Sequence, residues 1–258
     1  MLKTRIISAV IGVAGLLGIL SMGGVYWQAL FIILAAIALY EYYMMMVKTG
    51  HKALFIPGYI LLFLLMGSAK YPAYLNQGLY VFMVILVVYA VLGYPRLSIV
   101  EIALSLLGPA YIGFCFSFAL KVSELEPAFI IMLLAFILTW SSDVGGYAFG
   151  TLWGRHKMVP SLSPGKSWEG AIGALLLSVG MALVFLQVFE LDKLNYAYAL
   201  VMAVLASIAA QFGDLFISSM KRYFGVKDTG TIIPGHGGVL DRFDAFLLVV
   251  PLVYYFFR

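Results

Sequence analysis

The chain has 258 residues, of which 64% are hydrophobic and only 11% are charged. A soluble domain carries about 25% charged residues, so this chain has too few polar side chains to cover a water-exposed fold. Its net charge of +4 is modest and is typical of a membrane protein with charged loops on one face, so we expect no nucleic-acid partner. The composition excludes a soluble globular domain and predicts a protein embedded in the lipid bilayer.

Apolar runs of about 20 residues match the thickness of a bilayer core when they are helical. The sequence has nine such candidates, which predict an all-α, polytopic membrane protein. Turn residues and charges separate them, and two of the separating loops are long and rich in glycine and proline, at 150–170 and 218–238. The nine predicted spans are 6–22, 25–47, 53–69, 77–94, 98–120, 127–149, 170–190, 195–217 and 239–257.

Lysine and arginine collect on the cytoplasmic side of a membrane protein, so their distribution predicts the orientation. If the N-terminus is cytoplasmic and nine spans alternate, twelve of the sixteen basic residues face the cytoplasm. The reverse orientation gives the opposite bias. We therefore expect both long loops to be cytoplasmic. The four basic residues expected on the outer face are Lys70, Lys121, Lys193 and Arg258.

Four aspartates lie at the cytoplasmic ends of predicted spans: Asp143, Asp214, Asp241 and Asp244. A charge at the centre of a membrane helix costs about 2.5–3.5 kcal/mol, so the placement of such residues is informative. Asp241 and Asp244 share one helix face because they are three residues apart. Converging carboxylates repel unless a cation neutralises them, and their hard oxygens suit Mg²⁺. The alternative for each aspartate alone is a charge at the membrane interface.

The two long loops combine basic residues with glycines that let a backbone approach a phosphate. Lys221, Arg222 and Lys227 precede Gly237 and Gly238, which run into a helix N-terminus that favours anions. Taken alone, the glycines indicate a structural turn and the cations indicate membrane orientation. Together they predict a phosphate site, which the Lys166 loop would complete. A P-loop around Lys166 is excluded because Pro160 stands where its first glycine belongs.

The segment from Ser218 to Asp244 resembles the signature of bacterial phosphatidate cytidylyltransferases, also called CDP-diacylglycerol synthases. It reads Ser218-x-Met220-Lys221-Arg222, Lys227-Asp228-x-Gly230, Ile233-Pro234-x-His236-Gly237-Gly238-Val239 and Asp241-Arg242-Phe243-Asp244. The earlier motifs Ser142-Asp143-x-Gly145-x-Tyr147 and Ser163-Pro164-x-Lys166-x-Trp168-Glu169-Gly170 are similar too. The family often has Glu where this chain has Ile217. The resemblance divides the chain into N-terminal membrane helices, 1–120, and a catalytic membrane region, 121–258, that holds both loops.

The resemblance implies that CTP and phosphatidic acid react to give CDP-diacylglycerol and pyrophosphate, with Mg²⁺ and a second cation such as K⁺. It also implies a multi-pass protein of the inner membrane, an active site facing the cytoplasm, and a homodimer. Asp143 is expected either to ligate a cation or to pair with Lys166, and His236 to position phosphate, move a proton or hold the loop. The expected catalytic residues are Asp214, Ser218, Lys227, Asp228, His236, Asp241 and Asp244, the expected phosphate or substrate ligands are Lys166, Lys221, Arg222, Lys227, Gly237, Gly238 and Arg242, and the expected metal ligands are Asp214, Asp241 and Asp244, with Asp143 as a further candidate.

Two other functions fit parts of the pattern. A CTP-dependent polyprenol or phytol kinase would transfer the γ-phosphate and release CDP. An ion or solute transporter would place its acidic residues near the membrane midplane, often within inverted repeats. The acidic residues here lie toward one face and no repeat is visible in the sequence, which favours the cytidylyltransferase.

Overall fold

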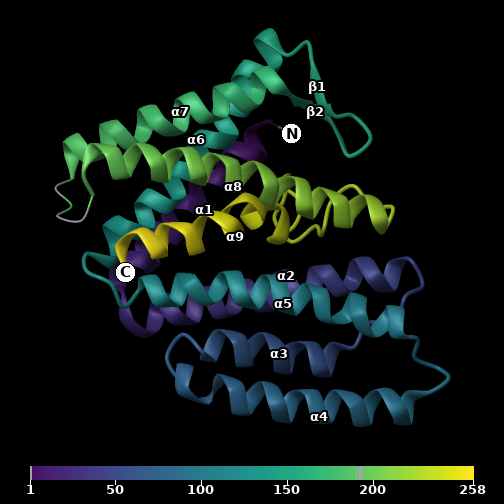
Figure 1. The fold of residues 1–258 in the computed structure, drawn as a ribbon. Coiled ribbons are helices and arrows are strands. Elements are labelled where there is room, and N and C mark those ends of the chain that lie inside the picture. Colours follow the sequence, from purple (N-terminus) through teal and green to yellow (C-terminus); the bar gives the residue numbers. More distant parts are fainter. Residues whose placement is uncertain (1, 190, 192–193) are drawn as a thin grey trace. The chain divides into compact units, whose positions relative to one another are not determined.

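The computed structural model describes residues 2–189, 191 and 194–258 (Figure 1). The turn residue Asp192 and the predicted outer-face cation Lys193 lie outside these residues. The chain forms two compact units. The first unit holds the residues up to Ser123 together with Tyr223–Asp241, and the second holds Glu124–Arg222 together with Arg242–Arg258.

The first unit is built on three helices that pack on one another: α2 (Gly24–Lys48), α3 (Phe55–Gly67) and α5 (Ile99–Val122). On α2, Trp27 and Tyr42 are fully buried, and the Trp27 indole Nε1 donates to the Ala119 carbonyl at 2.9 Å. Tyr42 lies against Gly108 of α5, where an added Cβ would come within 2.3 Å of its ring. The other helices of this unit are α1 (Leu2–Met22), η1 (Pro72–Tyr74) and α4 (Leu75–Gly93), with α1 on α2 and α4 on α3.

Helix α5 begins at a capping box, in which side chains satisfy backbone N–H groups that the first turn leaves free. Glu101 N donates to Ser98 Oγ at 3.1 Å, and Ser98 N donates to Glu101 Oε2 at 2.8 Å. Lys52 N also donates to Glu101 Oε1, at 3.3 Å. Glu101 is thus a partly exposed carboxylate that caps a helix N-terminus.

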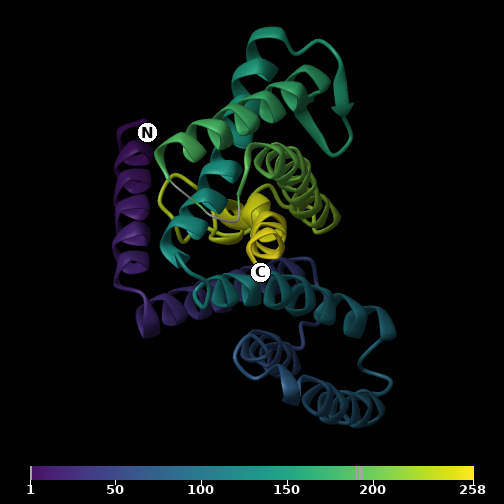
Figure 2. The same cartoon turned by 60° about the vertical axis from the view of Figure 1, so that its left-hand side comes forward.

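The second unit contains α6 (Ala128–Trp153), α7 (Trp168–Val188), most of α8 (Tyr196–Tyr223) and most of α9 (Leu240–Phe257). Between α6 and α7 the strands β1 (Lys157–Val159) and β2 (Ser163–Ser167) form an antiparallel hairpin at one end of both helices (Figure 2). Helices α6 and α7 approach so closely at Gly145 that a Cβ added there would lie 2.4 Å from the Gly173 carbonyl oxygen.

In the described part of the chain, nine α-helices overlap the nine predicted spans, and the all-α prediction is confirmed apart from the short hairpin. Six are long and apolar enough to cross a membrane, namely α2, η1 with α4, α5, α6, α7 and α8. Helix α3 has 13 residues, fewer than the roughly 20 that a bilayer core requires. Helix α9 has three charged residues among its first five, so nine membrane crossings stay a prediction.

Both predicted loops are shorter than expected. The prediction of a loop over 150–170 is wrong at both ends, because α6 continues to Trp153 and α7 begins at Trp168. The prediction of a loop from Ser218 is also wrong, because α8 continues to Tyr223. After Gly213, α8 meets no further Gly or Pro before Gly225, so the helix carries Ser218, Lys221 and Arg222 on its last turns. We call residues 224–239 the α8–α9 loop.

Candidate functional site

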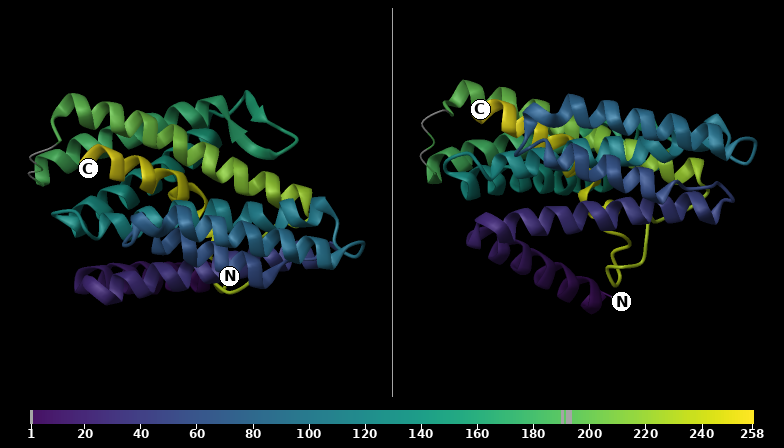
Figure 3. Two further views of the ribbon diagram at one scale, coloured as in Figure 1. Left: turned by 60° about the horizontal axis from the view of Figure 1, so that its bottom comes forward. Right: turned by 90° about the horizontal axis from the view of Figure 1, so that it is seen from below.

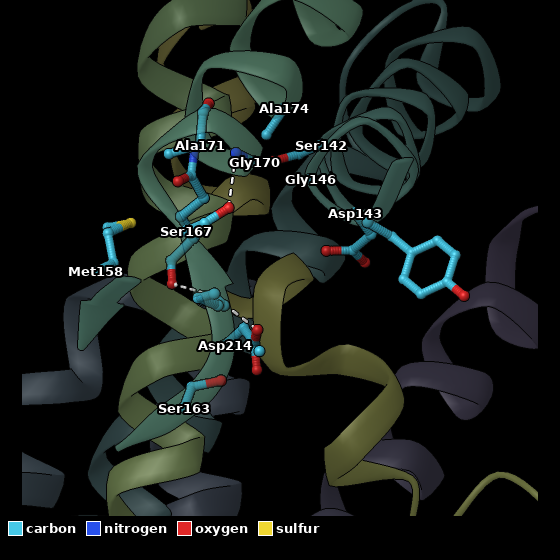
Figure 4. A pocket seen from close by; sticks show the side chains of 14 residues that line it. Ser142, Asp143, Gly146, Met158, Ser163, Ser167, Gly170, Ala171, Ala174 and Asp214 are labelled. Atoms are coloured by element: carbon cyan, nitrogen blue, oxygen red, sulfur yellow. Dashed lines mark hydrogen bonds and ion pairs between the residues drawn. The ribbon is translucent and has the colours of Figure 1, made fainter. Parts of the chain in front are cut away.

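A pocket of about 360 Å³ lies in the second unit, lined by α6, the hairpin, α7 and α8. Helix α6 contributes Ser142 and Asp143, β2 contributes Lys166, and α8 contributes Gln211 and Asp214. The carboxylates of Asp143 and Asp214 come from different helices and turn toward the same space (Figure 4). The small residues of α7 that line the wall, such as Gly170, leave room for a ligand.

Lys166 and Asp214 form an ion pair in this pocket, with 2.7 Å between Lys166 Nζ and Asp214 Oδ2. Lys166 Nζ also donates to the Gln211 carbonyl at 3.1 Å, and Ser218 Oγ donates to Asp214 Oδ1 at 3.3 Å. The two charged side chains are 22% and 32% exposed, so a ligand in the pocket can reach them. Of the two expectations for Asp143, the pairing with Lys166 is not the one formed, because the ion pair of Lys166 is with Asp214 of α8, and ligation of a cation by Asp143 stays a prediction.

Three carboxylates of the second unit lie close enough for each negative charge to act on the others: Asp143, Asp214 and Asp244. The positive charges of Lys166 and Arg242 act on Asp143, and that of Lys221 acts on Asp244. Gly213 allows this gathering. A Cβ there would lie 2.5 Å from the Asp244 carbonyl oxygen, so only glycine lets α8 approach α9 so closely. The predicted convergence of carboxylates and basic side chains is thus present in this unit.

Buried hydroxyls hold α6 against α8 beside the pocket. Ser142 Oγ and Ser207 Oγ are 3.3 Å apart, and Gln211 Nε2 donates to Ser207 Oγ at 3.4 Å. Ser142 directly precedes Asp143, and the Gln211 carbonyl accepts from Lys166 Nζ, so this chain of contacts holds the backbone that carries Asp143 and the acceptor of Lys166. Sequence reasoning missed Gln211, which is an uncharged residue in a long apolar run.

Asp241 belongs to the first unit, where it is 8% exposed. Its Oδ2 accepts hydrogen bonds from Thr229 N at 2.8 Å, Thr229 Oγ1 at 2.9 Å and Gly238 N at 3.1 Å. These bonds tie Thr229, inside the α8–α9 loop, to Gly238 near the C-terminal end of the loop. The structure therefore gives Asp241 a loop-closing position, and its role as a metal ligand stays a prediction.

The rest of the α8–α9 loop carries exposed Lys227 and Asp228 and half-buried His236. The His236 backbone N donates to the Ile233 carbonyl at 3.0 Å, while its Nδ1 is buried without a hydrogen-bond partner among the described residues. Gly237 adopts φ 85°, which favours glycine. The loop also reaches α1, where Ser8 Oγ donates to the Pro234 carbonyl at 3.1 Å (Figure 3, right).

Two further positions, Arg222 and Ile217, complete the description, and the predicted site residues then divide between the two units. Arg222 donates from Nε to the Leu162 carbonyl at 3.2 Å, which joins α8 to the hairpin. Ile217 is fully buried, so the departure from the family pattern lies inside the protein. The second unit holds Asp143, Lys166, Asp214, Ser218, Lys221, Arg222, Arg242 and Asp244, and the first holds Lys227, Asp228, His236, Gly237, Gly238 and Asp241.

Sequence reasoning also missed Glu41 of α2, which is 2% exposed and accepts hydrogen bonds from the α8–α9 loop and the start of α9. The available signal was its position as the sole charged residue in the apolar span 25–47. An ionisable residue inside a membrane span marks a functional candidate by default.

The donor chemistry of the second unit fits Mg²⁺. Carboxylate oxygens are the ligands that Mg²⁺ prefers, and it commonly uses one or two of them together with substrate phosphates. Among the described residues, no three Asp, Glu, His or Cys side chains are arranged to hold a metal ion by themselves. Asp143, Asp214 and Asp244 are the carboxylates of this unit that could share such a metal with the phosphates of a bound nucleotide.

Comparison with known proteins extends the resemblance to the whole chain. Residues 3–258 match the cytidylyltransferase family. Similar relatives include phosphatidate cytidylyltransferases of Staphylococcus haemolyticus and Staphylococcus epidermidis, each 37% identical over 98% of this chain and 97% of the relative. The enzyme of that name from Staphylococcus aureus is 36% identical over the same shares. With this match over nearly its full length, the chain belongs to the cytidylyltransferase family.

Proposed function

We propose that this protein is a phosphatidate cytidylyltransferase, which makes CDP-diacylglycerol and pyrophosphate from CTP and phosphatidic acid. The observation that carries the proposal is the match to relatives of that name over 97–98% of both chains. The pocket supports it, because apolar helices able to span a membrane line a cavity that holds a lysine and paired carboxylates. Such a site suits a lipid phosphate and a nucleotide together.

In the proposed reaction an oxygen of the lipid phosphate attacks the α-phosphorus of CTP, and the bond to the pyrophosphate oxygen breaks. Reactions of this kind depend on alignment and on neutralising the phosphate charges. Lys166 would contact a phosphate from its place in the pocket, while Ser218 and Gln211 hold Asp214 and Lys166 in position. Lys221 and Arg242 would add positive charge near the leaving pyrophosphate.

Mg²⁺, when bound, would neutralise and orient the nucleotide phosphates. We propose Asp214 and Asp244 as its ligands, with Asp143 as a third candidate. These neighbouring carboxylates repel one another, so a cation that binds together with CTP would neutralise their repulsion. Asp241 would act on the loop that carries Lys227 and Asp228.

We also propose that the protein lies in the inner membrane with nine crossings and a cytoplasmic N-terminus, and that it is a homodimer. The basic residues support this orientation, since twelve of sixteen fall on one side of a nine-span chain. A pocket on that side is open to cytosolic CTP and to a lipid headgroup at the interface.

The direct test incubates the purified protein with CTP labelled in the cytosine ring, phosphatidic acid and Mg²⁺, followed by product identification. We expect the label in a lipid and release of pyrophosphate. Labelled CDP with a phosphorylated lipid alcohol would instead identify a kinase. Asp214→Asn should abolish the lipid product, whereas Glu124→Gln, which also removes one carboxylate from the second unit but at an exposed site, should leave it unchanged. Near-normal activity of Asp214→Asn would refute the assigned role.

A further inference from the structure

Glu41 of α2 is a buried carboxylate that accepts hydrogen bonds from the backbone N–H groups at the start of α9. Val239 N donates to Glu41 Oε1 at 2.9 Å, and Leu240 N donates to Glu41 Oε2 at 2.9 Å. Helix α9 begins at Leu240, and the first N–H groups of a helix have no partner inside it. A carboxylate is favoured there because it accepts charge-assisted bonds at the positive end of the helix dipole. Glu41 thus joins α2 to the start of α9 within the first unit.

Glu41 also shares a hydroxyl with Asp241. Thr229 Oγ1 lies 3.2 Å from Glu41 Oε2 and 2.9 Å from Asp241 Oδ2. Thr229 is buried, and its backbone N donates to Asp241 as well. The two carboxylates therefore hold Thr229 from both sides, and this residue directly follows the exposed Lys227 and Asp228 of the loop.

Two glycines of the α8–α9 loop make room for Glu41. A Cβ added to Gly230 would lie 2.5 Å from Glu41 Oε1, and its three nearest atoms all belong to Glu41. A Cβ added to Gly238 would lie 2.4 Å from Glu41 Oε2 and 2.4 Å from Thr229 Oγ1. At these positions a side chain would have to displace the Glu41 carboxylate, so the glycines need no phosphate to explain them.

We propose that Glu41 is a positioning residue for the reaction: it fixes the α8–α9 loop and the start of α9, and acts on substrate only through them. The effect on turnover rests on the proposed function, whereas the effect on the loop does not. Burying a carboxylate in an apolar helix is costly unless it is hydrogen-bonded, and these bonds go to the one segment that carries the family signature. A carboxylate that merely stabilised α2 would not need partners almost 200 residues away.

The first test measures hydrogen–deuterium exchange on the full chain in detergent, which needs no activity. Glu41→Gln keeps the size of the side chain but loses one acceptor oxygen and the charge. We expect exchange in 229–240 to accelerate at least about tenfold, with α3 and α5 unchanged, because bonds to charged groups are the stronger ones. The matched control is Glu101→Gln, which removes a carboxylate from another helix N-terminus of the same unit and should leave 229–240 unchanged. Unchanged exchange in Glu41→Gln, or equal acceleration throughout the unit, would overturn the proposal.

The second test measures turnover and uses Gly230→Ala, which keeps Glu41 but pushes against it. Losing an outer partner of a functional site typically costs about 10- to 100-fold in activity. We expect kcat to fall by that factor in Glu41→Ala and in Gly230→Ala, with the KM for CTP changing much less. In the double variant that combines Glu41→Ala with Gly230→Ala, the carboxylate that the new Cβ would meet is gone. Gly230→Ala should therefore reduce kcat by less than about a further twofold below that of Glu41→Ala alone.

Each outcome of this cycle decides the question. If the fold-loss of kcat in the double variant equals the product of the two single fold-losses, the two positions act independently and the proposal is overturned. A change confined to KM would also overturn it. If the unaltered protein makes no CDP-diacylglycerol, the proposed function fails, while the exchange experiment still decides whether Glu41 holds the loop. If Glu41→Gln does not fold, Gly230→Ala, which keeps Glu41, carries the test through its kcat and its exchange in 229–240.

Discussion

Lys166 could act as a structural ion pair or as a phosphate contact in the transition state, and these two roles predict free-energy losses of different size on substitution. As a structural ion pair with Asp214, at 22% and 32% exposure, it would contribute about 1 kcal/mol to the free energy of unfolding. As a phosphate contact in the transition state, it would contribute about 3–4 kcal/mol to catalysis, equivalent to a 100- to 1,000-fold change in kcat. A protein with about 5–15 kcal/mol of stability stays folded after the smaller loss.

We therefore expect Lys166→Met to lower kcat by about 100- to 1,000-fold while the midpoint of thermal unfolding changes little. The assay is formation of CDP-diacylglycerol from labelled CTP, run beside thermal unfolding of the same detergent preparation. Lys157→Met is the matched control, because Lys157 is an exposed cation on the same hairpin. It removes the same positive charge from the same loop, so any effect on membrane orientation is equal in both variants.

The control should retain nearly full activity. A fall of less than about tenfold in kcat for Lys166→Met would refute a transition-state contact, because loss of one such donor costs more than that. Equal losses in both variants would show that Lys166 acts only through the charge of the loop. A large loss of stability would assign it a structural role.

Three further predictions concern packing, metal and orientation. Gly145→Ala should destabilise the protein by about 1–3 kcal/mol in thermal unfolding, because its Cβ meets backbone at 2.4 Å, whereas Gly146→Ala, with its nearest atoms at 3.8 Å, should not. Chelation with EDTA should abolish activity and added Mg²⁺ should restore it; activity that survives full chelation would contradict the metal assignment. An impermeant maleimide should label Ser161→Cys only in opened cells and Ala73→Cys in intact ones, and the buried native Cys115 should stay unlabelled; the opposite pattern would reverse the orientation.

The sequence predicted the helices well because their apolar runs are long and end at glycine, proline or charge. The sequence-based prediction failed where polar, glycine or proline residues did not mark the true ends of the helices and strands. Ser218 looked like the start of a loop because polar residues begin there, yet α8 continues to Tyr223 since its next glycine is Gly225. The hairpin was not predicted, because β1 has three residues and β2 contains Pro164 and Gly165, which are unusual in strands.

For the site, the sequence predicted which residue types meet but not which pairs form. Depth in the membrane indicated that the aspartates and Lys166 lie near one level. It could not distinguish Asp143 from Asp214 as the partner of Lys166, because that choice depends on the tertiary contacts that bring Lys166 of β2 to Gln211 and Asp214 of α8. Glu41 was visible as the sole charge of its apolar span, but its role could not be predicted, because its partners are mainly backbone N–H groups, which leave no mark in a sequence.

The space around Glu41 has a consequence for how this family diverges. Positions 41, 230 and 238 share one small volume, although the first lies far from the other two along the chain. A lineage that replaced the glutamate with a smaller residue could then accept alanine or serine at position 230. We expect these positions to change together among distant relatives. An alignment deep enough to detect correlated substitutions would reveal the contact without any structure.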